Sequence, residues 1–410
     1  MIDTATTMLK QSAFVGRQPI FDRQMEVFGY ELLYREGTGN SANIMDGDEA
    51  TARVMVNSFL ELGIDQIAGN AQAFLNLTAN FFLGQHYEVL PTKKVILEVL
   101  ESIEPTPSVL QSLIQARQHG YQIALDDFVV RESHRALLNH SDYVKVDVLV
   151  LTNEELKEQV AMLQEYPVRL LAEKVEDQGM YEQCLALGFE YFQGYFFCQP
   201  QILEGVSLSS NRMAVVLLLA KLQDPLIELH DLEELVINDV ALSVKLLRYV
   251  NSASVGLPRS VDSISQAIGL VGTERMRQWA ALLVLAQTGD KPSELMRVAL
   301  IRAHMCEALC PLYGMPPGQG FTVGLFSILD AYFDCDMHQL LADLPLAPEI
   351  LAALLKREGE LGIILEGMLA YERGEWEQCA AQTVEPGRLN SVYWESVEWA
   401  NGVMETVIRK

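Results

Sequence analysis

Isolated polar residues inside short apolar runs are the feature of the first 200 residues with the clearest chemical meaning. The runs AFLNL, VILEVL, QIALDD and RLLAE carry oxygen-bearing side chains at Asn76, Glu98, Asp126, Asp127 and Glu173. Glu31 stands in the same way after Phe-Gly-Tyr. A carboxylate that stayed buried and unpaired in such a run would be very costly. The pattern therefore predicts that these side chains gather at one site.

All six of these side chains offer oxygen atoms, which suit hard cations such as Mg²⁺ or Mn²⁺ better than zinc. Two such ions a few ångströms apart can clamp an in-line displacement at a phosphodiester. The adjacent pair Asp126–Asp127 could supply one bridging and one terminal ligand. Lys145, in YVKVD, could orient or polarise an attacking water, and the plainer alternative for it is a salt bridge to Asp127 or Asp147.

The elements that must position these residues follow from the pattern of the chain. Short runs of Val, Ile, Leu and Phe are typical of buried parallel strands. Helical stretches at 48–63, 107–120 and 154–166 alternate with them, and Gly120 is a candidate helix end. Alternating strands and helices indicate a parallel sheet, either open or closed into a (β/α) barrel. In such a barrel the strand ends that carry functional residues meet on one face.

The second half of the chain has a different pattern. After about residue 205 the strand signals stop, and apolar residues recur at three- and four-residue spacing in 238–254, 263–287 and 293–314. We therefore expect two domains, an α/β barrel over residues 1–205 and an all-helical domain over residues 206–410.

Composition excludes several classes of protein. The net charge of −25 and the pI of about 4.6 argue against nonspecific nucleic-acid binding, which needs Lys and Arg to displace counterions. Six scattered cysteines without a CxxC pair indicate reduced thiols rather than a zinc ribbon. No signal peptide is visible, and no apolar run reaches the 18 or so residues of a membrane span. We expect a cytoplasmic protein that does not bind membranes.

The ordered set of motifs resembles a known family. RQPIFDRQMEVFGYELLYR is similar to the opening of an EAL domain, with Glu31-Leu32-Leu33 where that family writes Glu-Ala-Leu. The match continues through LNL, LEVLE, DDF, VKVD, AEKVE and QGYFFCQP and covers roughly residues 14–203. The resemblance implies a TIM-like barrel that hydrolyses cyclic di-GMP to linear pGpG with two Mg²⁺ or Mn²⁺ ions.

The resemblance also implies a role for each matched residue. The metal ligands would be Glu31, Asn76, Glu98, Asp126, Asp127 and Glu173. Lys145 would face the catalytic water and would act in catalysis together with Glu31 and Glu173. Gln193 would support the site, Arg35 would approach a ligand phosphate, and Gln18 would lie on the barrel floor near the ligand.

The chain departs from that family directly after Asp-Asp-Phe. Active members continue with a loop that contains Gly and Ser, whereas this chain has Val129, Val130 and Arg131. Glycines permit backbone conformations that are closed to Val and Arg. In the family this loop organises the second metal and a dimer contact. Two functions therefore stay open: a phosphodiesterase, or a noncatalytic cyclic di-GMP receptor or scaffold.

The helical half resembles an HDOD domain, which is related to the HD phosphohydrolases. NDVALSVKLLRYVNSAS and VDSISQAIGLVGTERMRQWA carry this resemblance. Leu329 precedes Asp330, so the His-Asp dyad of the enzymes is absent, and His304 is better explained as a structural residue. The resemblance implies a noncatalytic domain that binds an unidentified protein partner, and it is compatible with a homodimer.

Overall fold

The computed structural model describes residues 13–36, 63–128 and 134–199, and then 215–222, 229–255, 261–285, 291–380 and 384–407 with short breaks. The chain divides into two compact units. One contains Met1–Phe197 and Glu372–Glu377, and the other contains Cys198–Tyr371 and Gln378–Lys410. The domain boundary that we expected near residue 205 lies outside the described residues.

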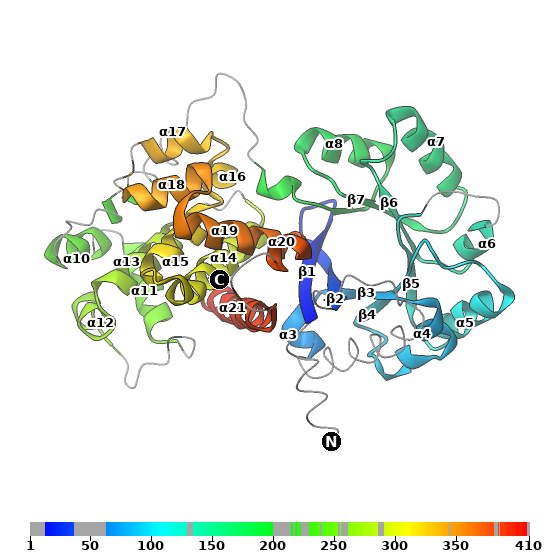
Figure 1. Cartoon of the computed structure of the whole chain (residues 1–410), viewed down its shortest axis with the longest axis horizontal. Coiled ribbons are helices and arrows are strands. Elements are labelled where there is room, and N and C mark those ends of the chain that lie inside the picture. The colour runs from blue at the N-terminus through cyan, green and yellow to red at the C-terminus, as the bar shows by residue number, and fades with distance from the viewer. Residues whose placement is uncertain are drawn as a thin grey trace. The chain divides into compact units, whose positions relative to one another are not determined.

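The first unit is a closed barrel whose strands follow one another in chain order (Figure 1). They are β1 (Ala13–Asp22), β2 (Val27–Glu36), β3 (Gln72–Leu77), β4 (Val95–Val99), β5 (Gln122–Leu125), β6 (Tyr143–Asp147), β7 (Arg169–Glu173) and β8 (Tyr191–Gln193). This confirms the TIM-like barrel. From β2 to β8 each strand is parallel to the next.

One strand departs from the parallel arrangement that the sequence pattern predicted. β1 is antiparallel to both of its neighbours, β2 and β8. The reason lies in the turn between β1 and β2, which is too short for the crossover that a parallel pair needs. In that turn Asp22 Oδ1 accepts hydrogen bonds from the backbone N–H groups of Gln24 (2.8 Å) and Glu26 (3.0 Å), and Met25 has a φ of 62°.

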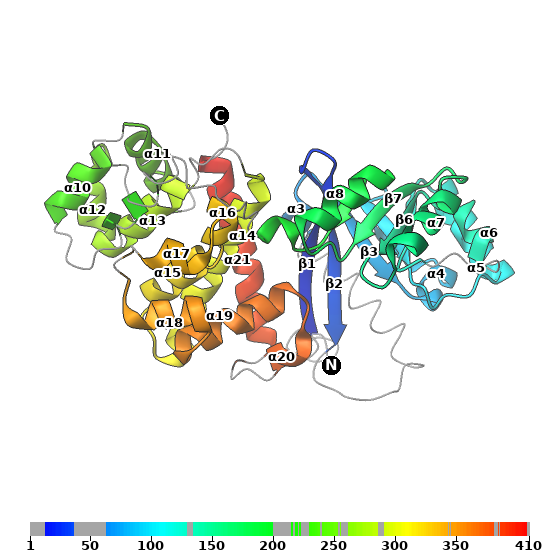
Figure 2. The same cartoon turned by 90° about the horizontal axis from the view of Figure 1, so that it is seen from above.

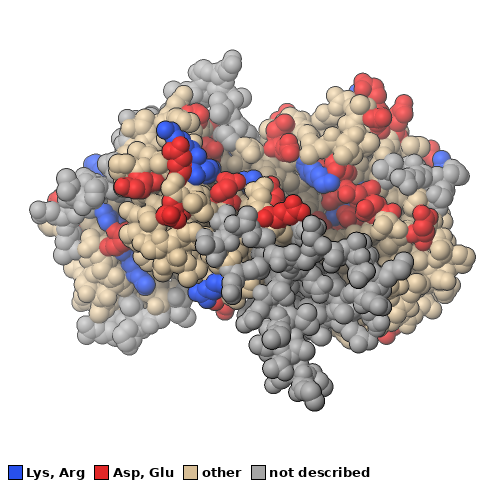
Figure 3. Space-filling model, in the orientation of Figure 1, with Lys and Arg blue, Asp and Glu red and all other residues tan. Residues whose placement is uncertain are grey.

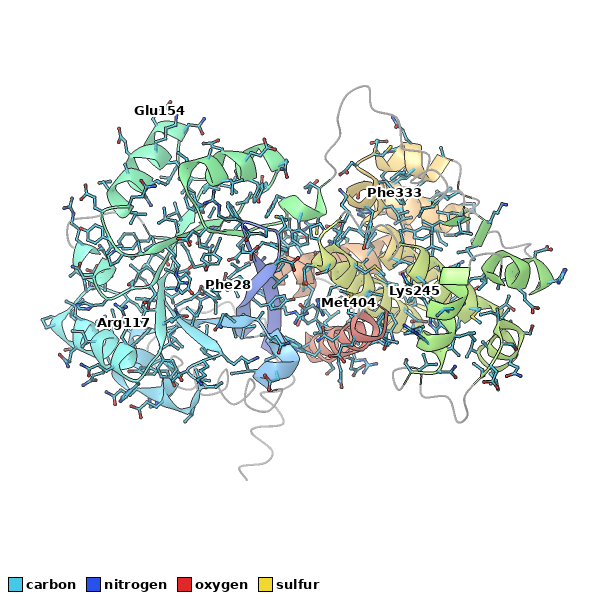
Figure 4. All side chains as sticks on the ribbon, turned by 180° about the vertical axis from the view of Figure 1, so that it is seen from behind. Phe28, Arg117, Glu154, Lys245, Phe333 and Met404 are labelled. Carbon is cyan, nitrogen blue, oxygen red and sulfur yellow. The ribbon has the colours of Figure 1, made fainter. Side chains whose placement is uncertain are left out.

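Helices surround the strands of the barrel (Figure 1). They are α3 (Ile64–Ala68), α4 (Ala79–Leu83), α5 (Pro107–Gln118), α6 (Arg135–Leu138), α7 (Asn153–Leu163) and α8 (Gln178–Leu187), with short 3₁₀ turns at His86–Val89 and Phe196–Cys198. The helices predicted at 107–120 and 154–166 are present, and Gly120 follows α5 with a φ of 94°. Arg117 on α5 and Glu154 on α7 lie on the outside of the barrel (Figure 4). The helix predicted at 48–63 falls almost wholly outside the described residues.

The barrel interior consists of an apolar layer with a polar layer above it. The apolar layer is a cluster of fully or almost fully buried side chains: Ile20, Phe74, Ile96, Ala124, Tyr143 and Leu171. Tyr191 packs against it, as does Phe28, which is labelled in Figure 4.

On most of these parallel strands a polar candidate follows the core residue by two positions. Phe74 precedes Asn76, Ile96 precedes Glu98, Ala124 precedes Asp126, Tyr143 precedes Lys145, and Leu171 precedes Glu173. Because side chains two apart on a strand share a face, the same alternation that builds the core directs the polar side chains into the barrel. On β1 the order is reversed, Gln18 before Ile20, because this strand runs the other way.

Every described element of the second unit is helical, as the sequence pattern predicted. The helices are α10 (Leu229–Ile237), α11 (Val240–Val250), α12 (Ile264–Val271), α13 (Thr273–Leu285), α14 (Ser293–Leu309), α15 (Pro317–Phe326), α16 (Leu329–Phe333), α17 (Met337–Ala342), α18 (Pro348–Lys356), α19 (Gly359–Glu372), α20 (Trp376–Ala380) and α21 (Pro386–Val407), with a 3₁₀ turn at Cys310–Tyr313. The long helix α14 packs against α15 and α21 (Figure 2). No helix in the described part of the chain combines the length and apolar character needed to cross a bilayer.

Candidate metal centre

A buried lysine surrounded by carboxylates stands at the centre of the site. The Lys145 ammonium nitrogen lies 2.7 Å from Asp126, 2.8 Å from Glu173, and 3.0 Å from both Glu31 and Glu98. The Lys145 and Glu98 side chains are wholly buried, and the other three carboxylates are largely buried. One ammonium therefore faces four carboxylates, so the pocket has an excess of negative charge when all of them are ionised.

Glu31 is the best-supported carboxylate of the group. Its Oε1 accepts a hydrogen bond from Asn76 Nδ2 (2.8 Å), and its Oε2 accepts from Gln193 Nε2 (2.6 Å) and from Lys145 (3.0 Å). Burial alone would raise the pKa of Glu31, but Lys145 and the amides of Gln193 and Asn76 together lower it. Glu31 is therefore held as an anion.

The other three carboxyls of the cluster are less stable than Glu31 in the ionised form. Burial, the largest cause, and the neighbouring carboxylates raise the pKa of Glu98 well above its ordinary value of 4.5, although Lys145 opposes the shift. Burial is also the largest cause that raises the pKa of Asp126. For the same reason the pKa of Glu173 is raised to about 8. A cation of higher charge than an ammonium would favour the ionised form of all three.

Asp127 does not join this cluster. Its backbone has a φ of 42°, in the left-handed region, and its Oδ2 lies 3.6 Å from Lys174 Nζ. Lys174 also binds Asp147 Oδ2 at 2.5 Å. The salt bridge considered for Lys145 with Asp127 or Asp147 is thus wrong, because Lys174 takes that role.

The residues expected to contact a ligand are only partly visible. Gln193 Nε2 donates to Gln18 Oε1 (3.0 Å) as well as to Glu31, and Gln18 Nε2 donates weakly to the Tyr195 hydroxyl (3.4 Å). Gln18 and Gln193 therefore form a hydrogen-bonded pair beside Glu31. The Arg35 side chain lies outside the described part of the structure.

A glycine fixes the position of Gln193. A Cβ atom on Gly194 would lie 2.1 Å from the carbonyl oxygen of Val175, and the φ of Gly194 is 149°. The close approach lets the N–H of Val175 donate to the carbonyl of Gln193 (3.0 Å) and the N–H of Phe196 donate to the carbonyl of Val175 (3.2 Å). The backbone therefore requires a glycine directly after Gln193.

The donor set fits a divalent cation. One oxygen from each of Glu31, Glu98 and Asp126 lies within 4.8 Å of the others. Six buried side-chain oxygens around the site accept no hydrogen bond: Asn76 Oδ1, both carboxylate oxygens of Glu98, Asp127 Oδ1, Glu173 Oε2 and Gln193 Oε1. Buried oxygens without a hydrogen-bond partner are rare in folded proteins, and such oxygens are available to coordinate a cation. Acidic side chains also gather around a few basic ones on the barrel surface in Figure 3.

The sequence did not predict the conformation or the ion pairs of Lys174. Lys174 stands within the quoted motif AEKVE, but nothing in that motif signals its positive φ of 58° or its pairing. The altered loop after Asp127, at residues 129–133, lies outside the described residues.

The helical unit contains no such collection of acids among its described residues. The residue before Asp330 is Leu329 rather than a histidine, and a leucine side chain cannot bind metal. His304 Nδ1 lies 2.9 Å from Ser396 Oγ, and its ring stacks on Trp399 with centroids 4.8 Å apart. Because Ser396 Oγ donates to the carbonyl of Val392, Nδ1 of His304 is the donor in their hydrogen bond.

Comparison with known proteins places both units in families. The EAL domain family matches residues 51–200, and the HDOD domain family matches residues 209–330. A Vibrio cholerae protein named cyclic di-GMP phosphodiesterase CdgJ is 33% identical over 394 residues, which cover 94% of this chain and 91% of the relative. The Bacillus subtilis protein YuxH, described as uncharacterised, is 32% identical over 407 residues, which cover 96% of this chain and 99% of the relative.

A solved structure is similar over about half of the chain. The EAL-domain protein YkuI of Bacillus subtilis, in complex with c-di-GMP and calcium, is 22% identical, with a TM-score of 0.37. The similarity covers 47% of this chain and 56% of that chain.

Proposed function

Because this chain belongs to the family that joins an EAL domain to an HDOD domain, we propose that its barrel binds cyclic di-GMP and hydrolyses it to linear pGpG. The relative named as a cyclic di-GMP phosphodiesterase supports this proposal, since it is similar along nearly the whole chain. In the reaction a water oxygen adds to phosphorus, the bond from phosphorus to the 3′ oxygen breaks, and the departing oxygen takes up a proton.

One observation of the site carries the proposal. Glu98 is wholly buried at the end of β4, yet neither of its oxygens accepts a hydrogen bond. Its cationic neighbour Lys145, 3.0 Å from Oε1, is shared with three other carboxylates, so the pocket needs further positive charge. Oxygen donors favour Mg²⁺ or Mn²⁺. The proposed ligands are Glu31, Asn76, Glu98, Asp126, Asp127 and Glu173. A bound divalent cation would polarise the phosphoryl group and lower the pKa of a coordinated water.

The residues of the chain have separate roles in this proposal. Lys145, held by four carboxylates, keeps their oxygens turned toward the centre of the barrel and would donate a hydrogen bond to the attacking water. Burial raises the pKa of the Glu173 carboxyl to about 8, and a bound divalent cation would lower it and favour the ionised form. Gln193 and Gln18 orient Glu31 from the side of β1 and β8.

The test is hydrolysis of cyclic di-GMP by the purified full chain in MnCl₂ or MgCl₂, followed by chromatographic detection of pGpG. Glu31→Ala is expected to abolish turnover and leave the fold intact. Glu26→Gln is a matched control, because Glu26 is an exposed carboxylate directly before the same strand. Metal-dependent turnover that persists in Glu31→Ala would overturn the assignment of the site.

A second function is favoured by the position of Asp127. Its pairing with Lys174 removes one expected ligand from the cluster, which agrees with a receptor that binds cyclic di-GMP without turnover. Calorimetric binding in CaCl₂, combined with no release of pGpG in MnCl₂, would identify this receptor.

We also propose that the helical unit binds a protein partner and performs no catalysis. The match to HDOD domains motivates the partner. Two observations support the absence of catalysis: Leu329, not a histidine, precedes Asp330, and His304 is engaged with Ser396 and Trp399. Replacement of His304 should therefore leave cyclic di-GMP turnover unchanged.

A further inference from the structure

We propose that Lys174 is a built-in cation that competes with the second divalent ion at the mouth of the barrel. Its ammonium pairs with Asp127, one of the proposed metal ligands, and with Asp147. The consequence is that this chain holds one divalent ion tightly and the other weakly. The inference rests on the proposed metal-dependent function and explains how the chain could regulate it.

The backbone around Lys174 gives the first line of support. Lys174 directly follows Glu173 at the end of β7 and has a φ of 58°, and Asp127 directly follows Asp126 and has a φ of 42°. Residues with a Cβ atom adopt this left-handed conformation at a cost in free energy, and Lys tolerates it less well than Asp or Asn. Backbone strain of this kind is concentrated at functional positions. We therefore expect the contacts of the Lys174 side chain to offset its cost in free energy.

The contacts of the Lys174 side chain give the second line. Its Nζ lies 2.5 Å from Asp147 Oδ2 and 3.6 Å from Asp127 Oδ2. Asp147 is firmly placed, because its other oxygen accepts a hydrogen bond from the backbone N–H of Leu149 (2.9 Å) and its side chain is only 10% exposed. Lys174 is thus anchored on Asp147 and extends its charge to Asp127.

Lys174 compensates the negative charge of Asp127 only in part. The 3.6 Å separation from Lys174 is a charge interaction rather than a hydrogen bond, and its buried Oδ1 has no hydrogen-bond partner. A divalent ion that used Asp127 would have to approach the Lys174 ammonium or displace it.

Lys145 cannot have the same effect on Asp127. It is wholly buried and bound to the other four carboxylates, whereas the Lys174 side chain is 49% exposed and pairs with Asp127. The two lysines therefore divide the acidic groups between them. Lys145 pairs with the four carboxylates of the inner cluster, and Lys174 pairs with Asp127 and Asp147.

The size of the effect follows from electrostatics. An ammonium within a few ångströms of a divalent ion weakens its binding by about tenfold or more, even at the dielectric constant of water. Removal of the Lys174 charge should therefore strengthen the weaker site by about tenfold or more, while the tighter site changes much less.

The experiment counts Mn²⁺ ions bound to the full chain without nucleotide, by the electron paramagnetic resonance signal of free Mn²⁺ during a titration at pH 7.5. Lys174→Met removes the charge, and Lys174→Gly removes both the charge and the backbone strain, which guards against a folding defect in the first variant. Lys174→Arg retains the charge. Lys93→Met is the control for net charge, because Lys93 is exposed before the start of β4, at the opposite end of the strands.

The expected result is one tight and one weak site in the parent chain, in Lys174→Arg and in Lys93→Met, with the weak site at least about tenfold stronger in Lys174→Met and Lys174→Gly. Two sites of equal affinity in the parent chain, or a weak site that both variants leave unchanged, would overturn the inference and leave the proposed function standing. A parent chain that binds no Mn²⁺ would overturn both.

Discussion

Replacement of Glu98 by Gln is expected to stabilise the metal-free barrel and to weaken its binding of divalent cations. Burial and the neighbouring carboxylates raise the pKa of Glu98 well above 4.5 in the folded chain. The folded state then binds its proton more tightly than the unfolded state does, so the free energy of unfolding falls as the pH rises above 4.5. A glutamine carries no charge and escapes this loss.

The distances in the site give the magnitude. Oxygens of Glu31, Glu98 and Asp126 lie within 4.8 Å of one another, so each repulsion with Glu98 costs about 3.5 kcal/mol at an effective dielectric constant of about 20. The attraction to Lys145 at 3.0 Å offsets about 5.5 kcal/mol of their sum. About 1.5 kcal/mol of repulsion remains, and the burial of the charge, the largest cause of the pKa shift, adds to it. The predicted gain is therefore at least about 2 kcal/mol, or at least about 4 °C in the Tm of the barrel.

The assay is thermal unfolding followed by circular dichroism at pH 8, first in EDTA and then in MnCl₂, with Glu26→Gln as the control. The transition that Mn²⁺ shifts in the parent chain belongs to the barrel. Glu98→Gln should begin from a higher Tm in EDTA and gain less from Mn²⁺ than the parent chain. A lower Tm in EDTA, or an undiminished Mn²⁺ shift, would refute the electrostatic account of the site.

Three further perturbations test other parts of the structure. Lys145→Met should lower the free energy of unfolding by about 3–5 kcal/mol in urea at pH 8 with EDTA, because four buried carboxylates lose their counterion; a loss below about 1 kcal/mol would contradict this. Gly194→Ala should destabilise the barrel by about 1–3 kcal/mol and weaken Mn²⁺ binding, since its Cβ would meet Val175; calorimetry that finds parent-like affinity would speak against the role of Gln193. Burial lowers the pKa of His304 from 6.5 to about 4, so the unfolded chain binds more protons between these pH values, and stability is lost as the pH falls from 6.5 to 4, by up to about 3 kcal/mol. His304→Phe should remove this loss in urea titrations and the exposed control His338→Phe should keep it; an unchanged pH profile in His304→Phe would exclude the histidine as its source.

The inner part of the site was predictable from the sequence because strand alternation determines it. Glu98 and Asp126 each stand two positions after a core residue on a parallel strand, so their side chains had to enter the barrel. The same rule applies to Lys145 and Glu173. Short apolar runs separated by helices were enough to place these four residues at one end of the strands.

Features that depend on single backbone angles or short turns were not predictable in this way. The antiparallel strand β1 follows from a turn at Asp22 that carries no strong turn signature, so the alternation of strands and helices gave no indication of it. The direction of Asp127 depends on a φ of 42°, which neighbouring residue types do not determine. Its separation from Asp126, and the role of Lys174, therefore became visible only in the structure.

The most direct test of the central claim is anomalous diffraction from crystals of the full chain grown with MnCl₂ and cyclic di-GMP. We expect a manganese peak within coordination distance of Glu98 and Asp126, where buried oxygens lack hydrogen-bond donors. Bound nucleotide without any manganese peak at these carboxylates would contradict the claim that this cluster is a metal centre.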